Sequence, residues 1–312
     1  MTHRRADREL PGIVLAELRR ASKAYGSGGA ATLAVQNLDL SVRAGELLAV
    51  LGPNGAGKTT ALGMLTGLTT PTSGTARLFG RDPRDRAARQ RMGVMLQSSG
   101  VPDTLKVREL LTAFRGYYPT PLPVSSVVEA AGLDGLEGRL FGTLSGGQQR
   151  RVLFGIALCG DPELVFVDEP TTGLDAEVRR TLWATLRDLA GAGRGVVLTT
   201  HYLEEADALA DRVVVLREGR VIAEGSPSQI KALVPGRRIT AESSVGQAEA
   251  AGWAGVHHAQ QDGTRLELLV SEPEPVLRHL LHRDHSVTGV TVEQPTLEDA
   301  FLTLTERAEK AA

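Results

Sequence analysis

The sequence contains a single cysteine, Cys159, and almost no net charge. One cysteine excludes an internal disulfide framework and a cysteine-rich zinc site. The 35 basic and 37 acidic residues give a formal net charge of −2, which provides no broad electrostatic attraction to nucleic acid or to anionic lipid. We therefore expect no nucleic acid among the partners of this protein.

Long apolar runs are missing as well. The longest are of the length of a strand, at Leu47–Leu51, Leu164–Val167 and Val213–Leu216, whereas a membrane-spanning helix needs about 20 apolar residues. The N-terminal residues Met1–Leu10 are charged and polar and lack the apolar core of a secretory signal. These absences predict a cytoplasmic protein whose contact with a membrane is indirect, through a partner.

The 312 residues are enough for about two domains, and the charge is divided unevenly between them. Residues 237–312 contain 7 basic and 12 acidic residues, a net charge of −5, whereas the preceding residues have a net charge of +3. Pro235-Gly236 interrupts the pattern between the two regions. We predict a disordered leader at 1–11, a first domain at 12–235 and an acidic accessory or dimerisation domain at 236–312.

The first domain alternates strand patterns with helical patterns. Short apolar runs predict buried strands at Glu46–Leu51, Leu164–Val167 and Gly195–Thr199, and helical spacing is found at Gly147–Leu158 and Glu177–Leu189. Strands that alternate with helices are typical of an α/β fold with a mostly parallel sheet.

The second domain has shorter elements in the order strand, helix, strand, strand, helix, strand. This order predicts a small α+β domain of the ferredoxin-like type. A last helix follows, with Thr296 as its N-cap. The predicted strands are 238–242, 255–259, 266–270 and 287–293, and the predicted helices are 245–251, 275–282 and 297–307.

A phosphate-binding loop follows the first buried strand. The segment Gly52-Pro53-Asn54-Gly55-Ala56-Gly57-Lys58-Thr59-Thr60 matches G-x-x-x-x-G-K-[ST]. Its glycines let backbone N–H groups face phosphate oxygens, Lys58 supplies a charge for the β- and γ-phosphates, and the Thr59 hydroxyl can bind Mg²⁺. A glycine-rich turn without function is the alternative, but chance gives the full pattern in only about 1–2% of chains of this length and composition.

Two carboxylates stand at the end of the apolar run Leu164–Val167. Asp168 can hold Mg²⁺ through water, and Glu169 is placed to polarise a water molecule for attack on the γ-phosphate. The alternative is an ordinary polar strand end. In a chain with a phosphate loop, the catalytic interpretation is favoured.

The segment Leu144-Ser145-Gly146-Gly147-Gln148 resembles the signature motif of ATP-binding-cassette (ABC) ATPases. The other motifs of that family occur in the family's order, over residues 13–234. Tyr25 matches the aromatic A-loop position, Gln97 the Q-loop, Gly173-Leu174-Asp175 the D-loop and His201 the switch histidine. Ser145 and Gln148 also form a helix capping box, so a plain helix start is an alternative that is compatible with phosphate binding.

The resemblance implies a P-loop NTPase fold, with a mostly parallel core sheet, an antiparallel β subdomain and a helical subdomain at about 98–143. It implies ATP and Mg²⁺ as cofactors and a homodimer in which two cassettes stack head to tail. Phosphate-loop residues 52–60 and Tyr25 would bind ATP. The implied catalytic residues are Glu169, His201 and Gln97, the implied Mg²⁺ ligands are Thr59, Gln97 and Asp168, and the residues acting across the dimer are Ser145, Gly146, Gly147, Gln148 and Asp175.

The C-terminal segment 294–302, Q-P-T-L-E-D-A-F-L, resembles the ending of single-cassette drug-export ATPases of the daunorubicin-resistance type. This implies an exporter subunit at the inner face of the cell membrane, a separate permease partner and drug or antibiotic efflux. In the helical subdomain, Phe114, Tyr117 and Tyr118 could contact the permease or could form an ordinary apolar helix face. A non-transport ABC regulatory ATPase, an exporter of lipid, peptide or ion, an importer and another P-loop enzyme such as a kinase are the alternatives.

Overall fold

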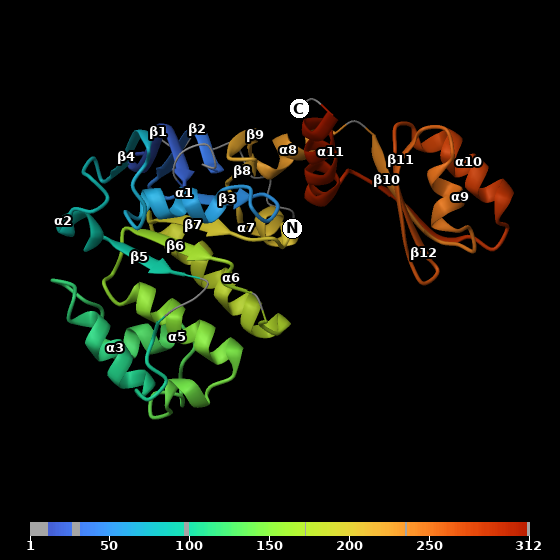
Figure 1. Ribbon diagram of the computed structural model, residues 1–312. Helices are drawn as coiled ribbons and strands as arrows, with labels where there is room; N and C mark the ends of the chain where they lie inside the picture. Colours follow the sequence, from blue (N-terminus) through green and yellow to red (C-terminus); the bar gives the residue numbers. More distant parts are fainter. Residues whose placement is uncertain (1–11, 27–31, 97–99, 172, 235, 311–312) are drawn as a thin grey trace. The chain divides into compact units, whose positions relative to one another are not determined.

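The computed structural model describes residues 12–310 except 27–31, 97–99, 172 and 235 (Figure 1). The chain divides into two compact units, Met1–Glu224 and Gly225–Ala312, here called the first and second units. The predicted leader at 1–11 lies outside the described residues. Helix α8 (Pro227–Ala232) belongs to the second unit, although it precedes the predicted boundary at Pro235-Gly236.

A six-stranded sheet forms the centre of the first unit, in the order β5-β6-β7-β3-β8-β9. The pairs from β5 to β8 are all parallel. Every residue of β3, β6 and β7 is buried, which explains why these strands are continuous apolar runs. The predicted α/β fold with a mostly parallel sheet is confirmed. The strands are β3 (Leu47–Leu51), β5 (Met92–Met95), β6 (Leu164–Asp168), β7 (Gly195–Thr199), β8 (Arg212–Arg217) and β9 (Arg220–Gly225).

A second sheet of the first unit is antiparallel, in the order β2-β1-β4. Its strands are β1 (Val14–Tyr25), β2 (Thr32–Arg43) and β4 (Ser73–Leu78). Buried side chains of β1 and β2 form one core cluster with side chains of β3 and of helix α1 (Lys58–Leu65). The sheet therefore supports the start of α1, where the phosphate loop ends.

Helices α3 and α4 pack against α5, on the side of the core sheet formed by β5 (Figure 1). Helix α3 ends at Arg115, and Gly116 is its C-cap. Tyr118 lies against Gly160, whereas the Tyr117 side chain is 69% exposed. The remaining helical elements of this unit are α2 (Arg86–Arg89), α3 (Val107–Arg115), α4 (Val124–Ala130), the 3₁₀ helix η2 (Phe141–Thr143), α5 (Gly146–Leu158), α6 (Ala176–Gly191) and α7 (Leu203–Leu209).

The second unit contains an antiparallel sheet in the order β11-β12-β10-β13. Apolar side chains from the sheet pack with those of α9 and α10 in one core cluster, and α11 packs against α8. The predicted ferredoxin-like arrangement is confirmed. The elements are β10 (Arg237–Glu242), α9 (Gln247–Ala251), β11 (Val256–Asp262), β12 (Arg265–Val270), α10 (Pro273–Arg283), β13 (Thr288–Glu293) and α11 (Leu297–Lys310).

None of the helices in the described part of the chain combines the length and the apolar character that a membrane span requires.

Candidate active site

The predicted phosphate loop connects the end of β3 to the first turn of α1. Gly57 is the N-cap of α1 and has a φ of +100°. A Cβ atom at this position would lie 2.5 Å from the Ala34 carbonyl oxygen, so a side chain does not fit. Among the described residues, no side chain caps α1, and Pro53, Asn54 and Gly55 are exposed. The loop thus presents backbone N–H groups and the positive end of a helix to solvent.

Lys58 lies beneath this loop and is only 8% exposed. Its ammonium group donates hydrogen bonds to the carbonyl oxygens of Gly52, at 2.6 Å, and Pro53, at 3.1 Å. Burial lowers the pKa of Lys58, while the negative charges of Glu169 and Asp168 raise it and so oppose this shift. The lysine is therefore close enough to the two carboxylates for their charges to act on it.

The ends of β6 and β7 bring the other predicted residues together. Asp168 is 5% exposed, and the Thr199 hydroxyl donates a hydrogen bond to its Oδ1. The next residue, Glu169, places its Oε1 3.5 Å from Nδ1 of His201. Because β3, β6 and β7 are parallel neighbours, their carboxyl ends meet at one edge of the sheet, where α/β proteins bind ligands.

The signature segment forms the start of α5. The Ser145 hydroxyl accepts the Gln148 N–H at 3.3 Å, and the Gln148 side chain accepts the Ser145 N–H at 3.0 Å. The predicted capping box is confirmed, and Ser145 and Gly146 are exposed. Gly147 lies close to Leu174, because a Cβ atom on this glycine would be 3.1 Å from Leu174 Cδ2.

Asp175 has a structural role within its own chain. Its carboxylate caps α6 and accepts the N–H groups of Glu177, at 3.1 Å, and Val178, at 2.9 Å. The role of Asp175 and of the signature segment in a second chain's site stays a prediction.

Tyr25 stands at the end of β1, where it pairs with Thr32 of β2. Tyr25 is 46% exposed, and the Lys23 ammonium lies 5.2 Å from its ring centroid. Two residues beyond Thr32, the Ala34 carbonyl approaches Gly57 of the phosphate loop. Tyr25 thus lies on the strand pair that borders the loop. Gln97, predicted to bind Mg²⁺ and water, lies outside the described residues.

Two residues at this site carry no motif signal. Thr199 contacts Asp168 and accepts the Glu169 N–H, and Arg150 Nη1 donates to the Glu169 carbonyl at 2.8 Å. In the sequence, Thr199 is marked only by its position two residues before His201. Arg150 is marked only by its position two residues after Gln148. The contacts depend on the packing of α5, β6 and β7, which the sequence does not display.

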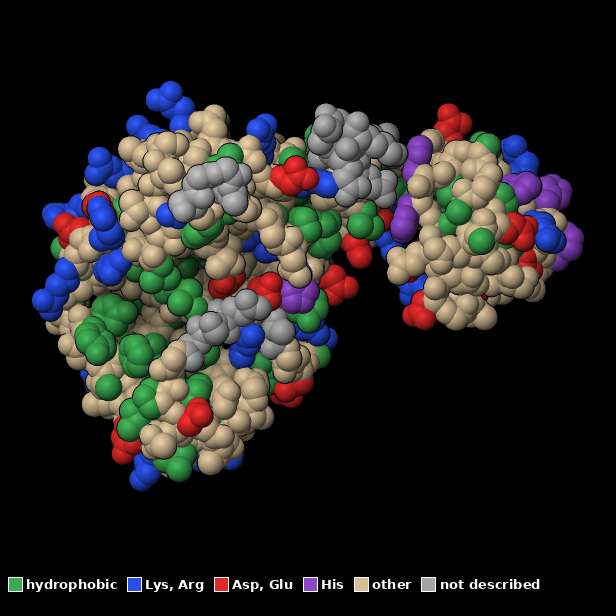
Figure 2. Space-filling view, viewed as in Figure 1, with side chains coloured by type: hydrophobic (Ala, Val, Ile, Leu, Met, Phe, Trp, Pro, Cys, Tyr) green, Lys and Arg blue, Asp and Glu red, His purple; other side chains and the backbone are tan. Residues whose placement is uncertain are grey.

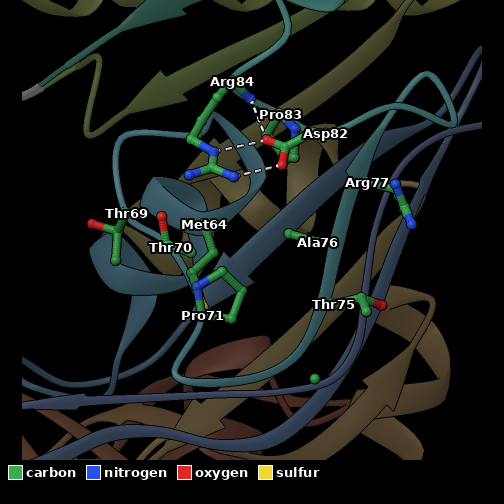
Figure 3. Close-up of a pocket in the computed structure, with 12 residues that line it drawn as sticks. Met64, Thr69, Thr70, Pro71, Thr75, Ala76, Arg77, Asp82, Pro83 and Arg84 are labelled. Atoms are coloured by element: carbon green, nitrogen blue, oxygen red, sulfur yellow. Dashed lines mark hydrogen bonds and ion pairs between the residues drawn. The ribbon is translucent and has the colours of Figure 1, made fainter.

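A cavity of about 200 Å³ lies apart from these residues, between α1, β4 and the turn at 82–84 (Figure 3). At its edge, the Arg84 guanidinium donates to both oxygens of Asp82, at 2.8 and 3.0 Å. These hydrogen bonds hold the pKa of Asp82 well below its usual range. None of the predicted nucleotide-binding residues lines this cavity, so it is a separate feature of the first unit.

Comparison with known proteins gives consistent results. A family model described as ABC transporter matches residues 35–172. A Nod factor export ATP-binding protein I of Burkholderia lata is 38% identical and covers 93% of this chain and 97% of its own length. The daunorubicin/doxorubicin resistance ATP-binding protein DrrA of Streptomyces peucetius is 38% identical, with 88% of each chain covered.

Solved structures agree with the fold of the first unit. The dimeric structure of MJ0796, described as a bacterial ABC transporter cassette, has a TM-score of 0.63 and 26% identity, and covers 68% of this chain and 98% of its own. The same cassette bound to ADP and Pi has a TM-score of 0.62 and 25% identity over the same shares of the two chains. The chain therefore belongs to the ABC transporter family and is an ABC-type ATPase.

Proposed function

We propose that the chain is the ATP-hydrolysing subunit of an exporter and that it drives transport through a separate membrane permease. The observation that carries this proposal is the extent of the match to a relative named for export, which includes both units and 97% of that relative. The fold of the first unit alone would not separate an exporter from other ABC ATPases.

The arrangement of Lys58, Glu169 and His201 supports an ATP hydrolysis mechanism. Lys58 binds the β- and γ-phosphates, and His201 hydrogen-bonds the γ-phosphate. The Glu169 carboxylate accepts a proton from the attacking water, whose oxygen bonds to the γ-phosphorus. The bond from that phosphorus to the bridging oxygen breaks, and ADP and phosphate leave.

Thr59, Asp168 and Gln97 are the proposed Mg²⁺ ligands. Hydroxyl, carboxylate and amide oxygens are ligands that suit this ion, and the charge of Asp168, at the end of β6, acts on Lys58. When bound, Mg²⁺ would offset the charge of the phosphates during transfer.

The exposed start of α5 supports a site completed by a second copy of the chain. Ser145, Gly146, Gly147 and Gln148 would contact the ATP held by the partner's phosphate loop, and Asp175 would link the two sites. Two cassettes would close head to tail on ATP and open after hydrolysis, moving the permease.

The permease would contact the helical part of the first unit at the inner face of the cell membrane. Figure 2 shows hydrophobic side chains gathered on the first unit between β5 and α3. Phe114 lies in the last turn of α3 and Tyr117 two residues after the helix ends, with ring centroids 6.0 Å apart, and Tyr117 is exposed. We propose these two residues for the contact, and Tyr118, which packs on Gly160, for the core.

The proposed cargo is a drug or antibiotic. DrrA is named for daunorubicin and doxorubicin resistance, and the Q-P-T-L-E-D-A-F-L segment of this chain resembles that type of exporter. An exporter of lipid, peptide or ion and a non-transport regulatory ATPase are the alternatives.

Glu169→Gln tests the enzymatic part. The amide keeps the size of the side chain and cannot act as the base, so turnover should fall about 10²- to 10⁴-fold while ATP still binds. Glu163→Gln, at the exposed position just before β6, is the matched control and should hydrolyse ATP normally. Unchanged hydrolysis by Glu169→Gln would reject Glu169 as the base.

Drug accumulation tests the cellular part. Cells that lack this protein should accumulate daunorubicin, and the wild-type chain should restore efflux where Glu169→Gln does not. Copurification with an integral membrane protein supports a transporter, and copurification with a cytoplasmic complex alone would favour the regulatory alternative.

A further inference from the structure

The main chain of Glu169 has an unusual conformation. Its φ is +48°, in the left-handed region. A residue with a side chain adopts this conformation only where its surroundings hold it there. The side chain is 15% exposed and faces His201, so the direction of the carboxylate depends on what fixes the backbone.

One contact holds Glu169 from β7. Its N–H donates to the Thr199 carbonyl at 3.0 Å and also to the Thr199 hydroxyl at 3.2 Å. The same hydroxyl donates to Oδ1 of Asp168. Thr199 is completely buried, and its hydroxyl thus connects both acids of the strand end.

A second contact holds Glu169 from α5. The Arg150 guanidinium donates to the Glu169 carbonyl at 2.8 Å. Arg150 lies on the helix whose first turn carries Ser145 and Gln148. A charged donor makes a stronger hydrogen bond to a carbonyl than a neutral one does.

We propose that Arg150 and Thr199 are positioning residues that hold the N–H and the carbonyl of Glu169 and thereby aim its carboxylate at the attacking water. This inference rests on the proposed role of Glu169 as the base. Neither residue touches the reacting atoms in this mechanism, so their loss should affect catalysis, and loss of the Arg150 guanidinium should leave nucleotide binding unchanged.

Arg150→Met tests the α5 side of this arrangement. It keeps the aliphatic stem and removes the guanidinium, and kcat should fall about tenfold to a hundredfold, as misplacement of a catalytic group does. The dissociation constant for ATP should stay within twofold. Arg150→Lys, which keeps a charged donor, should recover part of the loss.

The neighbouring arginine provides a matched control. Arg151 also donates through Nη1 to a backbone carbonyl, that of Gly132 in the helical part. Arg151→Met should keep kcat within twofold of wild type. Equal losses of kcat in Arg150→Met and Arg151→Met would overturn the proposal, because the effect would then belong to α5 in general.

Thr199→Val and Thr199→Ser test the β7 side and serve if Arg150→Met does not fold. Valine has the shape of threonine without the hydroxyl and should lower kcat about tenfold, whereas serine keeps the hydroxyl and should restore it. Equal activity of Thr199→Val and Thr199→Ser would overturn the positioning role of the Thr199 hydroxyl.

A binding measurement keeps the two hypotheses apart. In the Glu169→Gln background, Arg150→Met should still form an ATP-dependent dimer, detected by light scattering, because the signature segment is intact. Loss of that dimer would overturn the positioning role. If the single variant Glu169→Gln hydrolyses ATP, the role of Glu169 as the base is rejected instead.

Discussion

The phosphate loop and the start of α5 both present backbone N–H groups, but their surroundings differ. Lys58 is buried and lies near Asp168 and Glu169 of its own chain. Ser145 and Gly146 are exposed, and a Cβ atom on Gly146 would meet no described atom within 4 Å beyond its chain neighbours and the backbone of its own helix. Folding of one chain therefore assembles the first set of groups, whereas the second set faces outward, as expected of a surface that contacts another chain.

Lys58→Ala should have the largest effect on the phosphate-loop side. The charged hydrogen bonds to phosphate are lost, and the affinity for ATP should fall about 100-fold. Isothermal titration calorimetry with ATP measures this. Lys106→Ala, which removes an exposed lysine of the same unit, is the control and should bind normally. An unchanged dissociation constant in Lys58→Ala would contradict the phosphate-loop assignment.

Gly146→Asp should affect only the contact made by the start of α5, not the phosphate loop. A carboxylate at the start of a helix is favourable for that helix, so the fold should be preserved and the single chain should bind ATP within twofold of wild type. The negative charge would repel the partner's ATP, and turnover should fall at least about tenfold. Gly146→Ala adds a side chain without a charge and so separates the effect of charge from that of size. Full activity of Gly146→Asp would mean that Ser145 and Gly146 only start a helix.

Asp175 distinguishes a helix cap from an inter-chain contact. Asp175→Ala should lower the free energy of unfolding by about 1 kcal/mol, because the N–H groups of Glu177 and Val178 lose their acceptor. Asp175→Asn keeps the cap and should keep the stability in urea unfolding. A loss of ATPase activity in Asp175→Asn supports the predicted inter-chain role, and normal activity would leave the residue a cap.

The smallest predicted effect is on the pH dependence of stability, and it comes from Cys159 at the buried end of α5. Burial raises the pKa of the Cys159 thiol to about 11. The unfolded chain loses this proton near the ordinary value of 9.0, so the stabilisation is fully present below about pH 9 and is lost as the pH rises towards 11. Cys159→Ala should show a smaller decrease in the free energy of unfolding between these pH values. If the free energy of unfolding decreased equally with pH in wild type and in Cys159→Ala, the raised pKa of Cys159 would be contradicted.

The sequence predicts those parts of the site whose physical cause is local. The phosphate loop, the Ser145 and Gln148 capping box and the buried strands β3, β6 and β7 each depend on residues close together in the chain. Their spacing therefore predicts their structure.

Contacts between distant segments are not predictable in the same way. Thr199 and Asp168 are 31 residues apart, and Arg150 and Glu169 are 19 apart. Strand β4 is also missing from the sequence-based prediction, because only Leu78 among its six residues is buried and the strand has no apolar alternation. Its pairing with β1 decides its structure.

When ATP binds, the start of α5 in one chain should meet the phosphate loop of another. Because Cys159 is completely buried, engineered cysteines can report this contact with little background. Chains carrying Asn54→Cys and chains carrying Ser145→Cys, both with Glu169→Gln to retain ATP, would be mixed and mildly oxidised. Glu129→Cys, on the exposed surface of α4, replaces Ser145→Cys in the control.

Non-reducing electrophoresis should show a disulfide-linked dimer in the Asn54→Cys and Ser145→Cys mixture with ATP. No such dimer should form without ATP or in the control mixture. A mixture that stays monomeric with ATP, or that links equally in the control, would contradict this contact between the two chains.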